Sequence, residues 1–263
     1  NLAENTVKNI KSALSTVLND AKRARLVTFN ACEGARLPRN APAAKHGSMP
    51  TMAEVRHLLE VGEGTEIGRI LWVMAATGLR VGEGLGLYWS DIDLDGGAIT
   101  IERTTSRDRT GKAIMGSRTK NKKVRTLPLQ PWAVKVLREQ RVYVLERKMV
   151  ASHWSENDLV FPTKVGTVSD QANQRRFLNR LIAKTEKAHA QDPSKPAYRA
   201  GSFHSLRHFF SGIGLANAEA AQVQQLLGHT TLRMTTGTYG HLVNQTAVEV
   251  SEAVSRALGM DAG

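Results

Sequence analysis

The chain has 263 residues, 41% of them hydrophobic, so it can bury the core of one large domain or of one domain and part of another. Its formal net charge of +12 and its pI of about 10.1 favour nucleic acid or another anionic surface as the partner. No apolar run approaches the roughly 20 residues that a membrane-spanning helix needs, so we expect no membrane partner.

The sequence lacks the residue patterns of several other chemistries. Cys32 is the only cysteine, which excludes an internal disulfide and favours an intracellular location. No histidine–cysteine cluster has metal-ligand spacing, and no glycine-rich phosphate loop of the ATP-binding type appears. We therefore expect no metal, no ATP and no other cofactor.

The N-terminal segment, residues 1–29, has the apolar spacing of one amphipathic helix with lysines and arginines between the apolar positions. These basic side chains are either an ordinary solvated face or a surface that faces DNA. The chain begins inside this pattern, so we expect a further segment before it. Residues 38–50 contain prolines and a glycine, which predict a linker and a domain boundary.

A new helix is expected after this linker, because Thr51 and Glu54 have the spacing of a capping box. A second, largely buried helix is expected over 67–77. Gly78 is placed to end that helix and to let Arg80 turn into a cleft. On the residues alone, Arg80 could equally be an arginine that contacts free carbonyl groups at the helix end.

Residues 97–129 change to the pattern of β-strands. We expect strands over 98–101, 112–119 and 124–129, with the last two joined as a hairpin by the basic turn at 120–123. On the residues alone, this turn is a solvated hairpin tip.

Two more amphipathic helices are expected over 132–149 and 170–187. Arginines on the second either contact a DNA backbone or are simply exposed to solvent. The last segment, 246–263, predicts a short tail helix that either packs on its own domain or docks on a neighbouring protomer.

The stretch 203–241 carries the densest chemistry, because it contains Phe-His-Ser-Leu-Arg-His, then Leu-Leu-Gly-His, then Thr-Tyr-Gly-His-Leu. If the chain is helical from Ser205 onward, His204 and Arg207 share one face at the start of that helix. A helix N-terminus and an arginine fork both favour a bound phosphate. Gly228 is expected to end a later core helix, and His229 follows it directly.

These motifs resemble the C-terminal signature of the tyrosine recombinase, or phage integrase, family. Upstream, the Thr-Gly-Leu-Arg-x-x-Glu segment around Arg80 and Glu83 is similar to the first conserved box of that family. The resemblance implies a mainly α fold with a small antiparallel β-sheet (α+β), the tyrosine-recombinase catalytic domain, over 51–245. It further implies that 1–37 is the end of a helical core-binding domain.

The resemblance also implies the site residues. The catalytic set would be Arg80, Lys120, His204, Arg207, His229 and the nucleophile Tyr239. Structural support would come from Glu83 and His208, and DNA binding from Lys122, Lys123, Arg175 and Arg176. Lys122 and Lys123 are also the alternatives to Lys120 as the catalytic lysine.

One spacing departs from the family pattern, because Tyr239 lies ten residues after His229, one more than is common. Tyr239 is nevertheless the best match, since Tyr88, Tyr143 and Tyr198 lie in no matching motif.

The implied chemistry is strand cleavage and rejoining without metal or ATP. Arg80 and Arg207 would hold the non-bridging oxygens of one DNA phosphate. Tyr239 would attack the phosphorus to form a 3′-phosphotyrosyl bond, and Lys120 would protonate the leaving 5′ oxygen. The sequence thus predicts a site-specific DNA recombinase, an integrase that integrates or excises a phage or mobile element.

The expected partners are double-stranded DNA with specific recombination sites, copies of the same chain in a homotetramer, and accessory host or excision factors. The expected location is the bacterial cytoplasm or nucleoid. Two alternatives stay open on the sequence: a type IB topoisomerase-like DNA strand transferase, and a non-catalytic basic DNA-binding regulator.

Overall fold

The structure is a computed structural model that describes residues 4–36, 49–116, 124–219, 222–223, 226–227 and 240–260, without the side chains of 5 and 240–246. The chain divides into two compact units, residues 1–47 and 48–263. The division falls inside the range 38–50 for which the sequence predicts a linker; residues 37–48 lie outside the described part.

The first unit contains one helix, α1 (Glu4–Arg23), within its described residues. The sequence pattern predicted a helix up to residue 29, and this end is wrong. Arg25 adopts a left-handed φ of 58°, which an α-helix cannot continue through. The side chain of Asn30 then donates to the carbonyl oxygen of Ser15 at 3.2 Å, so the following segment folds back along α1.

Among its described residues, the second unit contains the helices α2 (Met52–Val61), α3 (Glu66–Thr77), α4 (Val81–Leu85), α5 (Pro131–Val150), α6 (Gln171–Gln191), α7 (Phe203–Asn217) and α9 (Gly240–Leu258), with a short 3₁₀ helix η1 (Trp89–Asp91). Local signals set several of their ends. The expected capping box is present, since Thr51 accepts from the amide of Glu54 and Glu54 accepts from that of Thr51. Gly78 ends α3 in the left-handed conformation, as predicted.

The strands of the described residues form two antiparallel sheets. One has the order β1 (Ile92–Asp93), β2 (Ala98–Ile101), β5 (Arg125–Pro128), and the other is the hairpin of β3 (Thr105–Arg107) and β4 (Ala113–Met115). The fold class, α+β with small antiparallel sheets, is therefore confirmed.

The predicted pairing of 112–119 with 124–129 is wrong. β4 pairs with β3, and β5 pairs with β2 in a register that sets Ile99 opposite Leu127. Both of these side chains are buried, so the β2–β5 pairing removes apolar surface from water. The β3–β4 hairpin buries less, since Thr105 is its one buried residue among those of the two strands.

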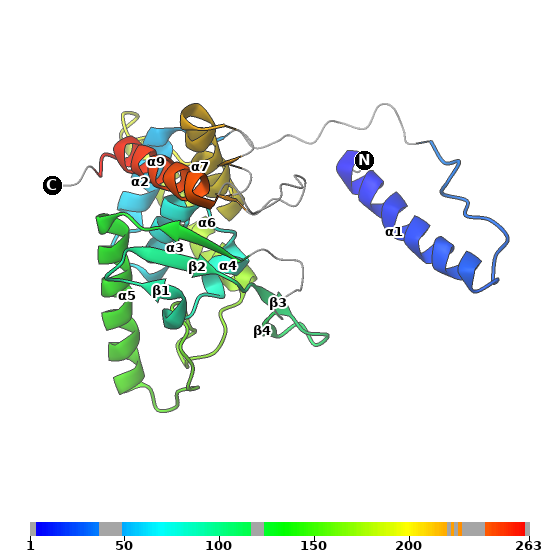
Figure 1. Cartoon of the computed structure of the whole chain (residues 1–263), viewed down its shortest axis with the longest axis horizontal. Helices are drawn as coiled ribbons and strands as arrows, with labels where there is room; N and C mark the ends of the chain where they lie inside the picture. The colour runs from blue at the N-terminus through cyan, green and yellow to red at the C-terminus, as the bar shows by residue number, and fades with distance from the viewer. Residues whose placement is uncertain are drawn as a thin grey trace. The chain divides into compact units, whose positions relative to one another are not determined.

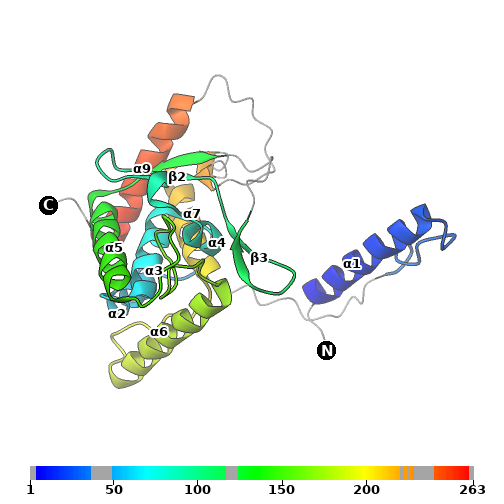
Figure 2. The same ribbon diagram turned by 90° about the horizontal axis from the view of Figure 1, so that it is seen from below.

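The core of this unit is built around α3, nearly all of whose side chains are buried. α3 packs against α5 and α7, and α9 lies across α7 and β5 (Figure 1). The β3–β4 hairpin projects from this body in both views (Figure 2).

The C-terminal helix α9 is longer than the tail predicted over 246–263, since it begins at Gly240. Val250 and Val254 on it are fully buried, and Trp132 of α5 donates to Ser255 at 2.8 Å. In this structure α9 thus packs on its own domain, and docking on a neighbouring protomer stays a prediction. None of the helices in the described residues is long and apolar enough to cross a membrane.

Candidate active site

Arg80 and Glu83 are held together at the start of α4. The left-handed turn at Gly78 ends α3 and brings Arg80 to the N-cap position of the next helix. The carboxylate of Glu83 accepts from the backbone amide of Arg80 at 3.0 Å and from its guanidinium at 3.1 Å. The Arg80 side chain remains 41% exposed, whereas that of Glu83 is 3% exposed. The buried carboxylate of Glu83 therefore holds Arg80 in place, and part of the Arg80 guanidinium remains accessible to a ligand.

A second arginine, Arg125, shares the same carboxylate, and the sequence interpretation missed it. Its Nη2 and Nη1 atoms donate to the two oxygens of Glu83 at 2.8 and 3.4 Å. A signal for it was present, because Arg125 alternates with Leu127 and Leu129, both of which are buried. An arginine on the inward face of a strand needs a buried acid.

The charge of Glu83 is stabilised by these two arginines. Burial alone would raise the pKa of its carboxyl group. Hydrogen bonding and attraction from Arg125, followed by those from Arg80, outweigh burial and hold the pKa below its ordinary value of 4.5. Glu83 is therefore an anion that orients two cations.

Arg207 is the third guanidinium of this group and is buried on α7. It donates to the carbonyl oxygen of Gly78 at 2.8 Å and to that of Leu227, which leaves other N–H donors of its five. Burial, followed by repulsion from Arg80 and Arg125, lowers its pKa to about 10. Its bond to Gly78, two residues before Arg80, places Arg207 near Arg80, and with a pKa of about 10 it stays protonated at neutral pH.

His204 and Arg207 lie three residues apart on α7, the helical spacing from which the sequence expected a shared face, but His204 is exposed whereas Arg207 is buried. The imidazole of His204 lies edge-on against that of His208, with ring centroids 4.5 Å apart. His208 sits one turn further along the helix and is also exposed.

Five predicted site residues lie outside the described part of the chain: Lys120, Lys122, Lys123, His229 and Tyr239.

The other three tyrosines occupy positions that suit packing. Tyr198 is fully buried, and burial raises the pKa of its hydroxyl well above the ordinary value. Tyr143 has the guanidiniums of Arg69 and Arg147 over its ring, and Tyr88 has that of Arg103.

The predicted DNA-binding residues Arg175 and Arg176 are exposed on α6, and Arg176 donates to Asn173 at 3.2 Å. Asp170 caps this helix by accepting from the amides of Ala172 and Asn173.

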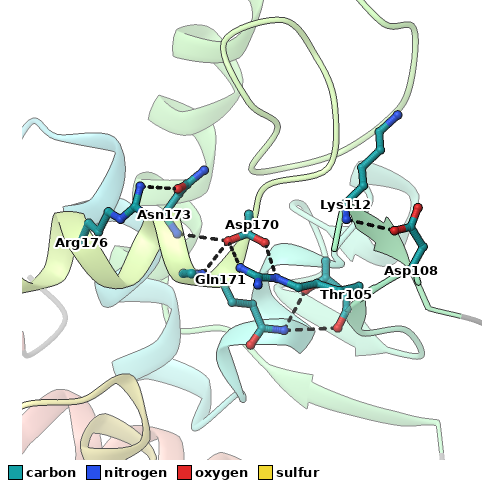
Figure 3. Close-up of polar contacts among 9 residues, drawn as sticks. Thr105, Asp108, Lys112, Asp170, Gln171, Asn173 and Arg176 are labelled. Atoms are coloured by element: carbon teal, nitrogen blue, oxygen red, sulfur yellow. Dashed lines mark hydrogen bonds and ion pairs between the residues drawn. The ribbon is translucent and has the colours of Figure 1, made fainter. Parts of the chain in front are cut away.

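The same Asp170 joins α6 to the β3–β4 hairpin. It accepts two hydrogen bonds from the guanidinium of Arg107, both at 2.8 Å. The amide group of Gln171 donates to the backbone oxygen and the side chain of Thr105 (Figure 3). Figure 3 also shows the Lys112 side chain extending away from Asp170. The start of α6 thereby holds both ends of β3, Thr105 at the base of the hairpin and Arg107 next to its turn.

The hairpin base also lies against the helix that follows Arg80. A Cβ atom at Gly82 would come within 2.6 Å of the Thr104 hydroxyl and 2.8 Å of the Gln171 amide. Only glycine permits this approach, which places the hairpin and the start of α6 beside the Arg80 site.

Arg80 and Arg125 pair with one carboxylate and Arg207 is held beside them, so the group keeps an excess of positive charge in a half-buried position. Guanidinium forks match the oxygens of phosphate in geometry and charge. The arrangement is therefore suited to bind an anion such as a phosphodiester, with the exposed Arg80 as the first donor.

Known proteins with similar sequences are named as tyrosine recombinases or as an integrase. A tyrosine recombinase XerC-like protein of Caldanaerobacter subterraneus is 26% identical over 95% of this chain and 66% of its own. A tyrosine recombinase XerC of Xanthomonas axonopodis is 31% identical over 76% of this chain and 56% of its own. A prophage integrase of Escherichia coli is 26% identical over 89% of this chain. The chain thus spans about half to two thirds of the length of these relatives.

Solved structures share the fold. The Tn1549 transposon integrase in complex with transposon right-end DNA superposes with a TM-score of 0.71 at 17% identity, covering 100% of this chain and 76% of the other. A λ integrase tetramer bound to a Holliday junction gives a TM-score of 0.51 at 19% identity, covering 88% of this chain and 61% of the other. The model of the phage integrase family matches residues 51–246, which contain the Arg80, Glu83, Arg125 and Arg207 cluster, and the chain belongs to this family.

Proposed function

We propose that the protein is a site-specific DNA recombinase, an integrase that cleaves and rejoins DNA strands through a 3′-phosphotyrosyl intermediate. The observation that carries this proposal is the pair of guanidiniums, of Arg80 and Arg125, bonded to the buried carboxylate of Glu83, with Arg207 held beside them through the carbonyl oxygen of Gly78. In a member of this family, an exposed arginine with two cations behind it is suited to a phosphodiester whose charge grows during the reaction.

Four residues are proposed to bind the scissile phosphate. Arg80 donates to a non-bridging oxygen from its exposed position, and Arg207 adds positive charge and further donors. His204 is exposed at the start of α7, where helix amide groups also favour an anion, and it hydrogen-bonds the phosphate and helps to take the tyrosine proton. His229 donates a further hydrogen bond.

Tyr239 is proposed as the nucleophile and Lys120 as the general acid. The Tyr239 oxygen loses its proton and bonds to phosphorus, the bond from phosphorus to the 5′ oxygen breaks, and Lys120 protonates that oxygen. The phosphate is then held on tyrosine and a free 5′ hydroxyl is released. Attack by a 5′ hydroxyl reverses these steps, so the strand is rejoined without ATP or water. The positions of Tyr88, Tyr143 and Tyr198 suit none of them to this role.

The relatives support a role in moving DNA elements. One is named a prophage integrase, and a transposon integrase shares the fold. We therefore propose integration or excision of a phage or mobile element, acting on double-stranded DNA in the bacterial cytoplasm or nucleoid. The λ integrase tetramer supports a homotetramer as the working assembly, with accessory host or excision factors. Residues 1–37 are proposed as the end of a core-binding domain and 51–245 as the catalytic domain.

Covalent capture tests the proposal. Wild type, Tyr239→Phe and the control Tyr88→Phe are mixed with fragmented DNA of the source genome and denatured in detergent, and the attached DNA is sequenced. We expect wild type and Tyr88→Phe to retain DNA from a few sites and Tyr239→Phe to retain none, because phenylalanine has no oxygen to bond phosphorus.

Other outcomes would replace the proposal. Retention by Tyr239→Phe would move the nucleophile elsewhere, and attachment spread over all sequences would indicate a topoisomerase. Salt-sensitive binding without any attachment would indicate a DNA-binding regulator.

A further inference from the structure

Arg125 is fixed by two separate parts of the fold. Its backbone begins β5 and pairs with Ile101 of β2, so the sheet holds it from one side. Its side chain is 12% exposed and forms the two-pronged ion pair with Glu83. The pair joins residues 42 positions apart in the sequence and connects the sheet to α4.

Glu83 passes this constraint on to Arg80. The oxygen that accepts from Nη2 of Arg125 also accepts from the backbone amide of Arg80. The other oxygen accepts from both guanidiniums. One carboxylate therefore sets both the backbone and the side chain of Arg80, and its own orientation depends on the fork of Arg125.

Charge gives Arg125 a second effect. Without it, Glu83 would pair with Arg80 alone, and the two charges would cancel. With Arg125 present, two guanidiniums face one carboxylate, so the group keeps a net positive charge that attracts an anionic ligand. Arg207 adds to this positive charge, because it donates to the carbonyl oxygen of Gly78, two residues before Arg80.

We propose that Arg125 is a positioning residue for DNA strand cleavage, which acts through Glu83 to orient the Arg80 guanidinium towards the scissile phosphate. This inference rests on the proposed function. It assigns Arg125 no contact with DNA.

Single-turnover attachment kinetics test this inference on a duplex that carries a site recovered by covalent capture. The proteins are wild type, Arg125→Gln, Arg80→Ala and the double variant, all at saturating DNA. Arg103→Gln is the matched control, because Arg103 is also a partly buried arginine paired with an acid, Asp91.

We expect Arg125→Gln to slow attachment at saturating DNA roughly 10- to 100-fold, since small misplacement of a catalytic group has effects of that size. The Kd for DNA should change little, because Arg125 does not touch DNA. In the Arg80→Ala background, Arg125→Gln should have no further effect, since the group on which it acts is gone. Arg125→Lys should recover part of the rate, because it keeps the charge and loses the fork.

Several outcomes would overturn the inference. One is a full additional loss in the double variant, which is what a general structural defect produces. Another is a change in Kd alone, and a third is an equal loss of rate in Arg103→Gln. If Arg125→Gln fails to fold, as judged by its thermal melt, Arg125→Lys takes its place in the same double-variant comparison. Failure of wild type to attach at all would instead overturn the proposed function.

Discussion

Glu83 is an acid that remains charged although its side chain is almost fully buried. Removing one member of a buried ion pair leaves the partners uncompensated, which costs about 3 to 5 kcal/mol. In this site two arginines would lose their shared acceptor. The residue therefore matters for the stability of the fold as well as for the orientation of Arg80.

Glu83→Gln should lower the free energy of unfolding at pH 7 by about 3 kcal/mol. The folded-state pKa of Glu83 lies below the ordinary value of 4.5, so its contribution is present above pH 4.5 and is lost as the pH falls towards the folded-state pKa. The difference between wild type and Glu83→Gln should therefore shrink below pH 4.5. Urea unfolding followed by circular dichroism at several pH values measures it.

Glu66→Gln provides the control with the opposite sign. Burial raises the pKa of Glu66 above 4.5 despite Arg147 and Tyr143. The contribution of Glu66 to the free energy of unfolding is therefore present below pH 4.5 and is lost as the pH rises through the folded-state pKa. Wild type should gain stability over Glu66→Gln on acidification. The same pH trend for both variants would show that the Glu83 carboxylate is not held as described.

At the scale of elements, the β3–β4 hairpin depends on its junction with α6. The hairpin has only two short strands, which are marginal in water by themselves. Arg107 and Gln171 supply side-chain bonds that tie it to the capped end of α6.

Arg107→Ala should loosen the hairpin without unfolding the domain. We expect faster hydrogen exchange at the amides of Asp108 and Gly116, which are bonded within the hairpin and at its base. The thermal unfolding midpoint should stay nearly constant, because these strands contribute little to the core. Arg109→Ala removes the same charge from the exposed tip and should leave exchange unchanged; equal exchange in the two variants would exclude the junction as the cause.

At the scale of the whole molecule, the net charge of +12 predicts DNA binding that weakens steeply with salt. Each phosphate that the protein neutralises contributes about 0.9 to the slope of log K against log salt. The surface that faces DNA can therefore be located by asking which charges alter the slope.

The Arg175→Ala, Arg176→Ala double variant should reduce this slope by roughly 2, if both guanidiniums contact phosphates. Fluorescence anisotropy of a labelled duplex across a series of KCl concentrations measures it. The control is the double variant Lys135→Ala, Lys148→Ala. It removes two exposed charges from α5 and should leave the slope unchanged. Equal slopes for both pairs would mean that only net charge matters and that α6 is not the contact.

The amino-acid sequence by itself determined the features that depend on neighbours within one turn of chain. The Thr51–Glu54 cap and the left-handed Gly78 are set by residues no more than four positions apart, and the structure contains both. Arg80, Glu83 and Arg207 were found through family motifs, and the structure pairs Arg80 with Glu83 and bonds Arg207 to Gly78, two residues before Arg80. Their catalytic roles stay a proposal.

Only the tertiary structure decided which distant segments meet. It paired β5 with β2, although the turn between the expected strands favoured a local hairpin, because that pairing buries Ile99 and Leu127. It also set Arg125 against Glu83, and it packed α9 on its own domain. Such contacts depend on which apolar and charged groups remain exposed after the other elements have packed together. No local sequence pattern encodes that information.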